Sequence, residues 1–151
     1  MMSRTCWRLA AVALSVTALA GCSKSQSDEA TVKSVVSGFF SDLGAGRGSD
    51  ACAALTGPAT RLAALGAELS NAPASCPEAV KVVNGQLSSD EKEALKNVKV
   101  KHATVNGDQA TIAPTDVEFS VNGKSSLLSS VKSGPTHLTK ASGSWRIDSL
   151  G

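Results

Sequence analysis

The chain has no tyrosine and few other aromatic residues. Its aromatic side chains are three phenylalanines and two tryptophans among 151 residues. Trp7 lies in an N-terminal leader described below, so the folded part contains only Phe39, Phe40, Phe119 and Trp145. Ligand pockets depend on aromatic and other apolar side chains with a few polar groups. We therefore expect no aromatic platform for sugars or flat ligands, whereas an aliphatic pocket for an apolar compound stays open.

Sequence motifs of several enzyme classes are also missing. There is no Gly-x-Ser-x-Gly nucleophile elbow, and no glycine-rich phosphate loop follows a predicted strand. The chain has only two histidines, His102 and His137, and its four cysteines contain no Cys-x-x-Cys pair. A metal site needs a denser cluster of ligands. We predict no metal ion and no other cofactor.

No apolar run is long enough to span a membrane comfortably. Arg4 and Arg8 precede an apolar run from Leu9 to Ala20, which is the order found in secretory signal peptides. A membrane-spanning helix needs about 20 apolar residues, so this run is typical of a cleaved leader. The sequence predicts a leader over residues 1–21.

The leader ends in Leu19-Ala20-Gly21-Cys22, which resembles the lipobox of bacterial lipoproteins at all four positions. The resemblance implies that the Cys22 sulfur carries diacylglycerol, that cleavage occurs just before Cys22, and that the new amino terminus is often acylated, with palmitate as the expected acyl group. Two acyl chains give stable anchoring, at roughly 0.8 kcal/mol per buried methylene. We expect an exported protein held at the outer face of the cell membrane. The alternative is an ordinary secretory signal with an incidental cysteine.

Removal of the leader leaves 130 residues with balanced charge. The leader contains two of the 15 Lys and Arg residues and none of the 13 Asp and Glu residues, so 13 of each sign remain. Without a basic surplus, nothing indicates nucleic-acid binding. Residues 23–27 are too polar to pack into a core and are typical of a tether. We expect residues 22–27 to form the lipidated cysteine with its tether, and residues 28–151 to form one domain.

Two cysteines remain once Cys6 leaves with the leader and Cys22 takes lipid. An even pair in an exported chain favours a disulfide between Cys52 and Cys76. In the chain-entropy treatment, closing a loop of this size stabilises the fold by about 3 kcal/mol. A metal or redox centre would need a different spacing.

The first half of the chain has helical periodicity. Six apolar residues between Val32 and Leu43 share one face, which predicts a helix from about Asp28 to Gly44. Further helical segments are expected at 49–55 and after Thr56-Gly57-Pro58, where the second has Leu62, Leu65 and Leu69 on one face. Another is expected from Ser75, with a Ser75–Glu78 capping box and a buried stripe of Cys76, Val80, Val83 and Leu87. The last, at 89–96, is expected to be a peripheral helix.

The second half alternates between apolar and polar residues. Turns at Asn106-Gly107, Asn122-Gly123 and Ser142-Gly143 separate predicted strands at 98–105, 109–113, 117–121, 124–131, 137–141 and 144–149. The alternation slips at 101–103 and at Pro114, where we expect bulges or bends. The last turn places Lys140 opposite Trp145 and Leu138 opposite Ile147. We predict an α+β domain whose N-terminal helices pack on a curved antiparallel sheet of about five or six strands.

Several of these segments together resemble small bacterial lipoproteins with a nuclear transport factor two-like domain, also called SnoaL-like or cystatin-like. The resemblance covers about 28–150 and depends on Phe39-Phe40, Leu55-Thr56 after a cysteine-bearing helix, Ser75-Cys76, and the closing Leu138-x-Lys140-x-Ser142-Gly143-x-Trp145-Arg146-Ile147. It implies a cone-shaped sheet wrapped around a long first helix, with a pocket at the wide end. Some members are enzymes and many only bind or dimerise, so the fold does not decide function.

Enzymes in this superfamily that resemble ketosteroid isomerase and scytalone dehydratase use an Asp or His base with Tyr or a second acid. This chain has no tyrosine to serve as that donor. The titratable residues on its predicted strands are His102, Asp116, Glu118 and His137. The candidate pocket residues are His102, Asp116, Phe119 and Trp145, although isolated histidines are more often surface groups and a hairpin Trp is more often core.

Three functional hypotheses follow. The first is a non-enzymatic, membrane-anchored module that binds an envelope protein or a small apolar ligand. The second is a pocket enzyme with His102 or Asp116 as general base, which requires one of them in a concavity beside another polar group. The third is a structural module, for example a homodimer, with a filled interior.

Overall fold

The domain is α+β, with its helices first and its strands last. The structure, a computed structural model, describes residues 20–57, 75–122, 124–127 and 134–150. The described helices are α1 (Ala20–Ala45), α2 (Gly48–Ala53), α3 (Cys76–Gln86) and α4 (Ser89–Lys96). The strands are β1 (Lys99–Val100), β2 (Thr104–Asn106), β3 (Gln109–Ile112), β4 (Val117–Val121), β5 (Lys124–Leu127), β6 (Thr136–Ala141) and β7 (Ser144–Ser149). This order confirms the predicted class.

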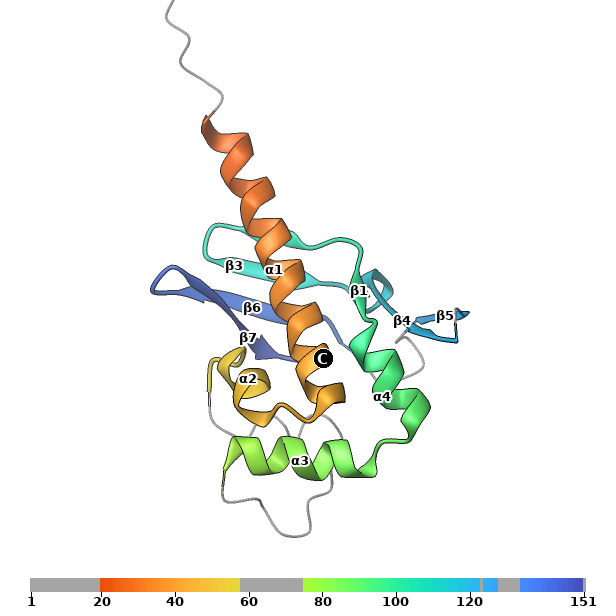
Figure 1. Cartoon of the computed structure of the whole chain (residues 1–151). Coiled ribbons are helices and arrows are strands. Elements are labelled where there is room, and N and C mark those ends of the chain that lie inside the picture. Colours follow the sequence, from red (N-terminus) through yellow and green to blue (C-terminus); the bar gives the residue numbers. More distant parts are fainter. Residues whose placement is uncertain (1–19, 58–74, 123, 128–133, 151) are drawn as a thin grey trace, which may run out of the picture.

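The strands form two antiparallel sheets where the sequence predicts a single curved one. One sheet has the order β1-β4-β5 and the other has the order β2-β3-β6-β7 (Figure 1). The predicted strand 98–105 is interrupted at 101–103, so its two ends belong to different sheets. A short 3-10 turn, Pro114–Asp116, makes the second connection between the sheets, at the expected bend. The predicted irregularities therefore coincide with two of the three points at which the chain changes sheet, and the third lies between β5 and β6.

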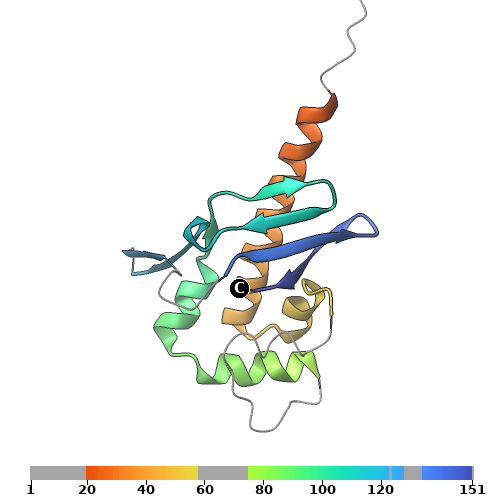
Figure 2. The same cartoon turned by 180° about the vertical axis from the view of Figure 1, so that it is seen from behind.

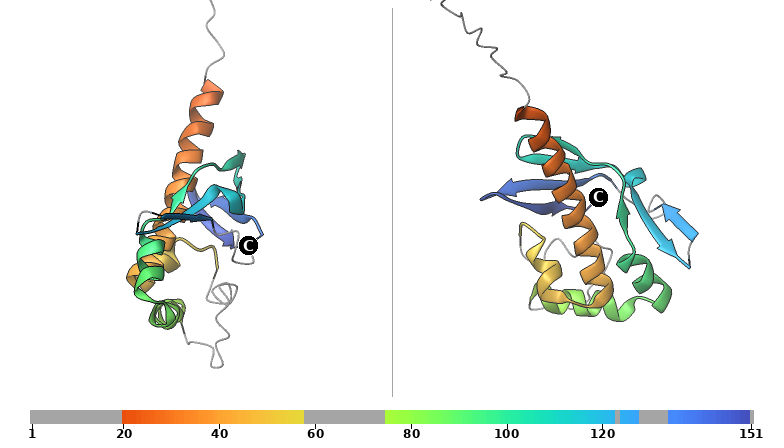
Figure 3. Two further views of the ribbon diagram at one scale, coloured as in Figure 1. Left: turned by 90° about the vertical axis from the view of Figure 1, so that its right-hand side faces the viewer. Right: turned by 45° about the horizontal axis from the view of Figure 1, so that its top comes forward.

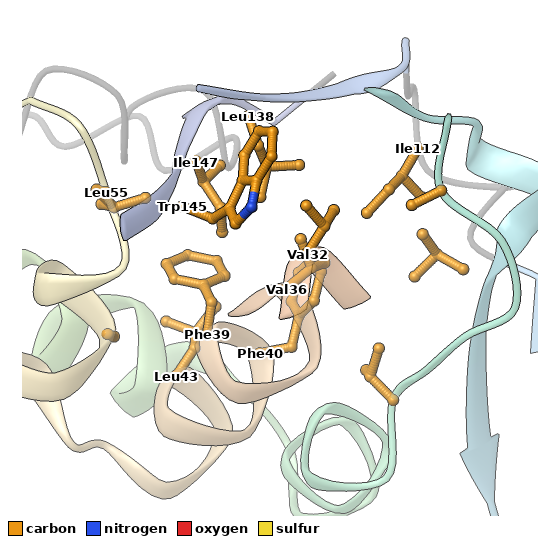
Figure 4. Close-up of a cluster of buried hydrophobic side chains, with 14 of the residues drawn as sticks. Val32, Val36, Phe39, Phe40, Leu43, Leu55, Ile112, Leu138, Trp145 and Ile147 are labelled. Atoms are coloured by element: carbon orange, nitrogen blue, oxygen red, sulfur yellow. The ribbon is translucent and has the colours of Figure 1, made fainter. Parts of the chain in front are cut away.

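Helix α1 holds the core together. Seen from behind, the four-stranded sheet lies in front of α1, so the helix crosses one face of that sheet (Figure 2). Five of the six residues on its predicted apolar face are buried, Val35 is half-buried, and the face packs against side chains of β3, β6 and β7 (Figure 4). Phe40 also meets Phe119 of β4 edge to face, with ring centroids 5.5 Å apart. One continuous apolar core thus joins α1 to both sheets.

Several helix boundaries differ from the sequence predictions. Helix α1 begins at Ala20, eight residues before the expected start, and the helix expected after Pro58 falls outside the described residues. Ser75 does precede α3, but its side chain makes no capping hydrogen bond. The capping box lies instead at α4, where Ser88 and Glu91 bond reciprocally. Of the stripe predicted on α3, Val80 and Val83 are buried, while Cys76 and Leu87 are half-buried.

Helix α4 is more tightly packed than a peripheral helix. A Cβ atom added at Gly44, near the end of α1, would lie 2.8 Å from the Lys92 carbonyl oxygen and 2.9 Å from the Leu95 Cβ atom. This close approach needs a glycine. Side views show the same helical layer beside the sheets and the first turns of α1 extending beyond them (Figure 3).

The β6–β7 hairpin has the predicted register. Ser142 and Gly143 both adopt positive φ, at 51° and 81°, as a two-residue turn between twisted strands requires. Lys140 therefore faces Trp145, and Leu138 faces Ile147. In the β2–β3 hairpin, Asn106 pairs with Gln109, so its turn is Gly107-Asp108, one residue later than predicted.

Candidate functional site

The four candidate pocket residues lie in three different places. Phe119 and Trp145 belong to the core, where they are 7% and 4% exposed. Asp116 lies in the 3-10 turn, and its backbone carbonyl accepts a hydrogen bond from the Lys101 amide. His102 lies beside β2, at the surface. The described residues therefore show no shared cavity that joins these four side chains.

His102 borders an open depression between α1 and β2 and has a carboxylate neighbour. Its Nδ1 atom lies 3.2 Å from Glu29 Oε1, yet its side chain is 63% exposed. The depression has a volume of about 240 Å³, smaller than most ligand pockets. It is lined by Gln26, Glu29, His102, Ala103, Thr104 and Val105. Such exposure favours a solvated surface contact over a general base, since catalytic bases are usually tuned by burial.

Glu29 is the electrostatic centre of this depression. It accepts a hydrogen bond from the Ala103 amide at 3.4 Å, and Lys33 Nζ lies 3.3 Å from the same oxygen. The Ala103 amide, followed by the Lys33 side chain, holds the pKa of Glu29 below its ordinary value of 4.5. The carboxylate is therefore ionised at neutral pH and ties α1 to the segment before β2.

A second polar group ties α1 to the β6–β7 hairpin. Asp28 Oδ1 accepts hydrogen bonds from Lys140 Nζ at 2.7 Å and from the Trp145 indole at 3.2 Å. Lys140 Nζ also lies 5.5 Å from the centre of the Trp145 ring, which is the range of a cation–π contact. The sequence predicts Lys140 opposite Trp145, but it contains no local signal for Asp28, which is 112 residues from Lys140.

A polar depression lies on the face of the four-stranded sheet that points away from α1. It also measures about 240 Å³, and its exposed or half-exposed side chains come from three strands. Thr111 Oγ1 and His137 Nδ1 lie 3.4 Å apart across β3 and β6. The lining residues are Gln109, Ala110, Thr111, His137, Leu138, Thr139 and Asp148.

Asp148 lies in this depression, at an irregularity in β7. Leu138 pairs with Ile147 whereas His137 pairs with Ser149, so Asp148 is the extra residue of a β-bulge. Its carboxylate accepts hydrogen bonds from the hydroxyls of Thr139 and Thr56. The alternation of β7 gives no signal for this bulge, and the sequence predictions did not single out Asp148.

The same network closes the outer edge of β7. The Thr56 amide donates to the Ile147 carbonyl at 2.9 Å, and the Ile147 amide donates to the Ala54 carbonyl at 2.7 Å. Leu55 thereby forms a parallel bridge with Ile147. This short segment covers a strand edge that would otherwise be open to pairing.

The predicted Cys52–Cys76 disulfide is present in the structure. Its Cα atoms lie 6.1 Å apart, and it joins α2 to the first residue of α3. Cys22 lies in the first turns of α1, where only the backbone is described. Of the other titratable residues predicted on strands, Glu118 pairs with Lys101 at 3.2 Å, and His137 lies in the polar depression.

Among the residues that the structure describes, no three His, Cys, Asp or Glu side chains cluster as metal ligands would. No helix in this described part is both long and apolar enough to cross a membrane. Comparisons with protein-family models, curated proteins and solved structures gave no match to this chain.

Proposed function

We propose that this protein is an exported lipoprotein, anchored by lipid on Cys22 to the outer face of the cell membrane, whose domain is a non-enzymatic binding module for an envelope protein. The Cys52–Cys76 disulfide is the observation that carries the proposal. Disulfides of this kind persist in oxidising compartments outside the cytoplasm. An oxidised pair within the domain agrees with the export that the leader and the Leu19-Ala20-Gly21-Cys22 lipobox indicate.

In this proposal the domain is a member of the nuclear transport factor two-like superfamily. The long first helix crossing an antiparallel sheet, with the strands after the helices, supports that assignment. The two sheets then correspond to two parts of one curved, cystatin-like wall, which bends where the chain passes from β1 to β2 and from β3 to β4.

The interior favours a protein partner over a small apolar ligand. Where the cone would hold a ligand, the side chains of Phe39, Phe40, Phe119, Leu138 and Trp145 fill the described core. The polar depression on the outer face of the four-stranded sheet offers hydroxyl, amide, imidazole and carboxylate groups instead. Groups of this kind suit hydrogen bonding to a partner's polar surface.

Lipid attachment is tested by mass spectrometry of the intact protein, purified from the membranes of its own cells. We expect a chain that begins at Cys22 and carries the mass of diacylglycerol, with or without a further acyl chain. The variant Cys22→Ser should lack that mass and leave the membrane fraction. Cys6→Ser is the matched control and should be acylated normally, because Cys6 leaves with the leader. An unmodified chain that retains residues 1–21 would refute the proposal.

Partner binding is tested by crosslinking in the same cells. A photoreactive amino acid at His137, on the polar depression, should give a discrete adduct with another protein. The same probe at Lys81, which is exposed on α3, is the control and should give none. Adducts of equal yield at both positions, or at neither, would contradict a partner at this face.

A further inference from the structure

Helix α1 continues through the residue that the proposed function assigns to lipid attachment. The helix is unbroken from Ala20 to Ala45, and residues 23–27, whose composition favours a tether, belong to it. Its first turns extend beyond the sheets, whereas the rest lies against them (Figures 1 and 3). Cys22 precedes Asp28 by six residues, which corresponds to about 9 Å along a helix axis.

Helix α1 is held against the rest of the domain at Asp28 and Glu29, next to the turns that extend beyond the sheets. Asp28 is bonded to Lys140 and Trp145 of the β6–β7 hairpin, and Glu29 is bonded to the Ala103 amide and lies beside His102. These contacts come from the β6–β7 hairpin and from the segment before β2, and they are made by consecutive residues of α1. They restrain both the tilt and the rotation of the helix relative to the sheet.

Further contacts show which parts of the domain lie beside each end of α1. The Lys140 amide donates to the Asp108 carbonyl at 2.7 Å, so the β2–β3 turn lies beside the Asp28 end. The Asn84 side chain donates to the carbonyls of Leu43 and Gly44, so α3 lies at the opposite end. Asp28 and Leu43 are separated by about 22 Å along the helix axis.

We propose that α1 is a rigid spacer between the lipid and the domain, which holds the β2–β3 turn toward the membrane and α3 away from it. This inference rests on the proposed lipid attachment at Cys22. A flexible tether would let the domain tumble and present any face to the membrane. A rigid helix presents one orientation, so only partners on one side of the molecule are within reach.

Energy transfer to a bilayer measures this orientation. The acylated protein is placed in vesicles whose outer headgroups carry acceptor dyes, and a donor is attached to a single introduced cysteine. One label is at Asp108→Cys, in the β2–β3 turn, and the other is at Val82→Cys, which is 40% exposed on α3. The native thiols do not compete, because Cys52 and Cys76 are paired and Cys22 carries lipid.

We expect transfer to be several-fold more efficient from Asp108→Cys than from Val82→Cys. Replacing residues 25–27 by three glycines should largely remove that difference, because each glycine weakens a helix by about 1 kcal/mol relative to alanine. Replacing the same residues by three alanines is the matched control, which removes the same side chains but favours helix, and it should retain the difference.

The outcomes separate the two proposals. Acylated, membrane-bound protein with equal transfer from the two labels would overturn the rigid spacer and leave lipid attachment intact. Protein without an acyl group, which intact mass spectrometry of the same sample detects, would overturn both. A glycine variant that keeps the full difference would also contradict a helical spacer.

Discussion

Lys140 shows how one side chain can serve two elements. Its ammonium group contacts Asp28 on α1 and lies over the Trp145 ring on β7, and both charged side chains are less than one-fifth exposed. A charge-assisted hydrogen bond with so little exposure is screened less by water than a surface pair. We therefore assign Lys140 a structural role in holding α1 to the hairpin.

Replacing Lys140 by methionine tests that role. Methionine keeps most of the apolar stem but removes the donor to Asp28, so we expect the free energy of unfolding to fall by about 1.5–3 kcal/mol. Urea denaturation measures the change. Lys99→Met, at an exposed position of β1, is the control and should change stability by less than about 0.5 kcal/mol. Equal effects of the two substitutions would show that the Asp28 contact contributes nothing.

The sequence predicts only part of this contact. The Ser142-Gly143 turn fixes the strand register, which places Lys140 opposite Trp145, and the structure confirms that pairing. From its place near the expected start of the helix, Asp28 could instead serve as a helix cap. Its contact with Lys140 depends on the way α1 crosses the sheet. Tertiary contacts between residues so distant in sequence leave no local pattern.

At the level of elements, α2 and α3 pack closely beside the disulfide, and the contact depends on Gly48 of α2 having no side chain. A Cβ atom on Gly48 would lie 2.7 Å from the Pro77 carbonyl oxygen and 2.8 Å from its Cα atom. Both are backbone atoms, so they cannot move aside as a flexible side chain would. The Cys52–Cys76 bond further limits any separation of the two helices.

We predict that Gly48→Ala destabilises the fold by about 1–3 kcal/mol, the usual cost of overpacking. Gly38→Ala is the control, because a Cβ atom at Gly38 meets nothing within 4 Å and alanine favours helix by about 1 kcal/mol. Thermal denaturation should therefore move the two midpoints in opposite directions. A midpoint for Gly48→Ala at or above that of the parent would mean that α2 and α3 separate freely.

The segment that covers the edge of β7 gives a second prediction at this level. Asp148→Asn weakens the acceptor for the Thr56 and Thr139 hydroxyls. The Thr56 and Ile147 amides, whose bonds join this segment to β7, should then exchange with deuterium faster than in the parent. The Leu138 amide, in the sheet interior, is the internal reference. Asp108→Asn, at an exposed turn, should leave all three unchanged, and slower or unaltered exchange in Asp148→Asn would contradict this role.

The sequence predicts strands and hairpins better than sheet membership. The alternation locates β3, β4, β6 and β7 to within a residue or so, because each has one face against the core. The break at 101–103 is predicted, but local pattern does not show that the chain changes sheet there. Similarly, Ser75–Glu78 and Ser88–Glu91 share one capping pattern, and only the second forms the bonds.

On the scale of the whole molecule, α1 joins the apolar core, the β6–β7 hairpin and the segment before β2. Its buried face contacts both sheets, while Asp28 and Glu29 bond to chain segments that are distant in sequence. The stability of the domain should therefore depend on the charges of these two carboxylates. Glu29 is the α1 residue through which pH should act, because the Ala103 amide and Lys33 lower its pKa from 4.5.

A lowered pKa in the folded state makes stability depend on pH with a definite sign. The ionised Glu29 contributes stability that is fully present above the unfolded-state pKa of 4.5 and is lost as pH falls through the lower folded-state value. We expect Glu29→Gln to be less stable than the parent at pH 7, with the difference shrinking as pH falls below 4.5. Urea denaturation at pH 7, 5, 4 and 3 measures both curves.

Glu91→Gln is the comparison, because Ser88 also lowers the pKa of Glu91, but only within the α4 capping box. At pH 7 the Ala103 amide should exchange with deuterium faster in Glu29→Gln than in the parent, whereas Glu91→Gln should leave its exchange rate unchanged. Parallel stability curves for the parent and Glu29→Gln would show that this carboxylate does not couple folding to pH.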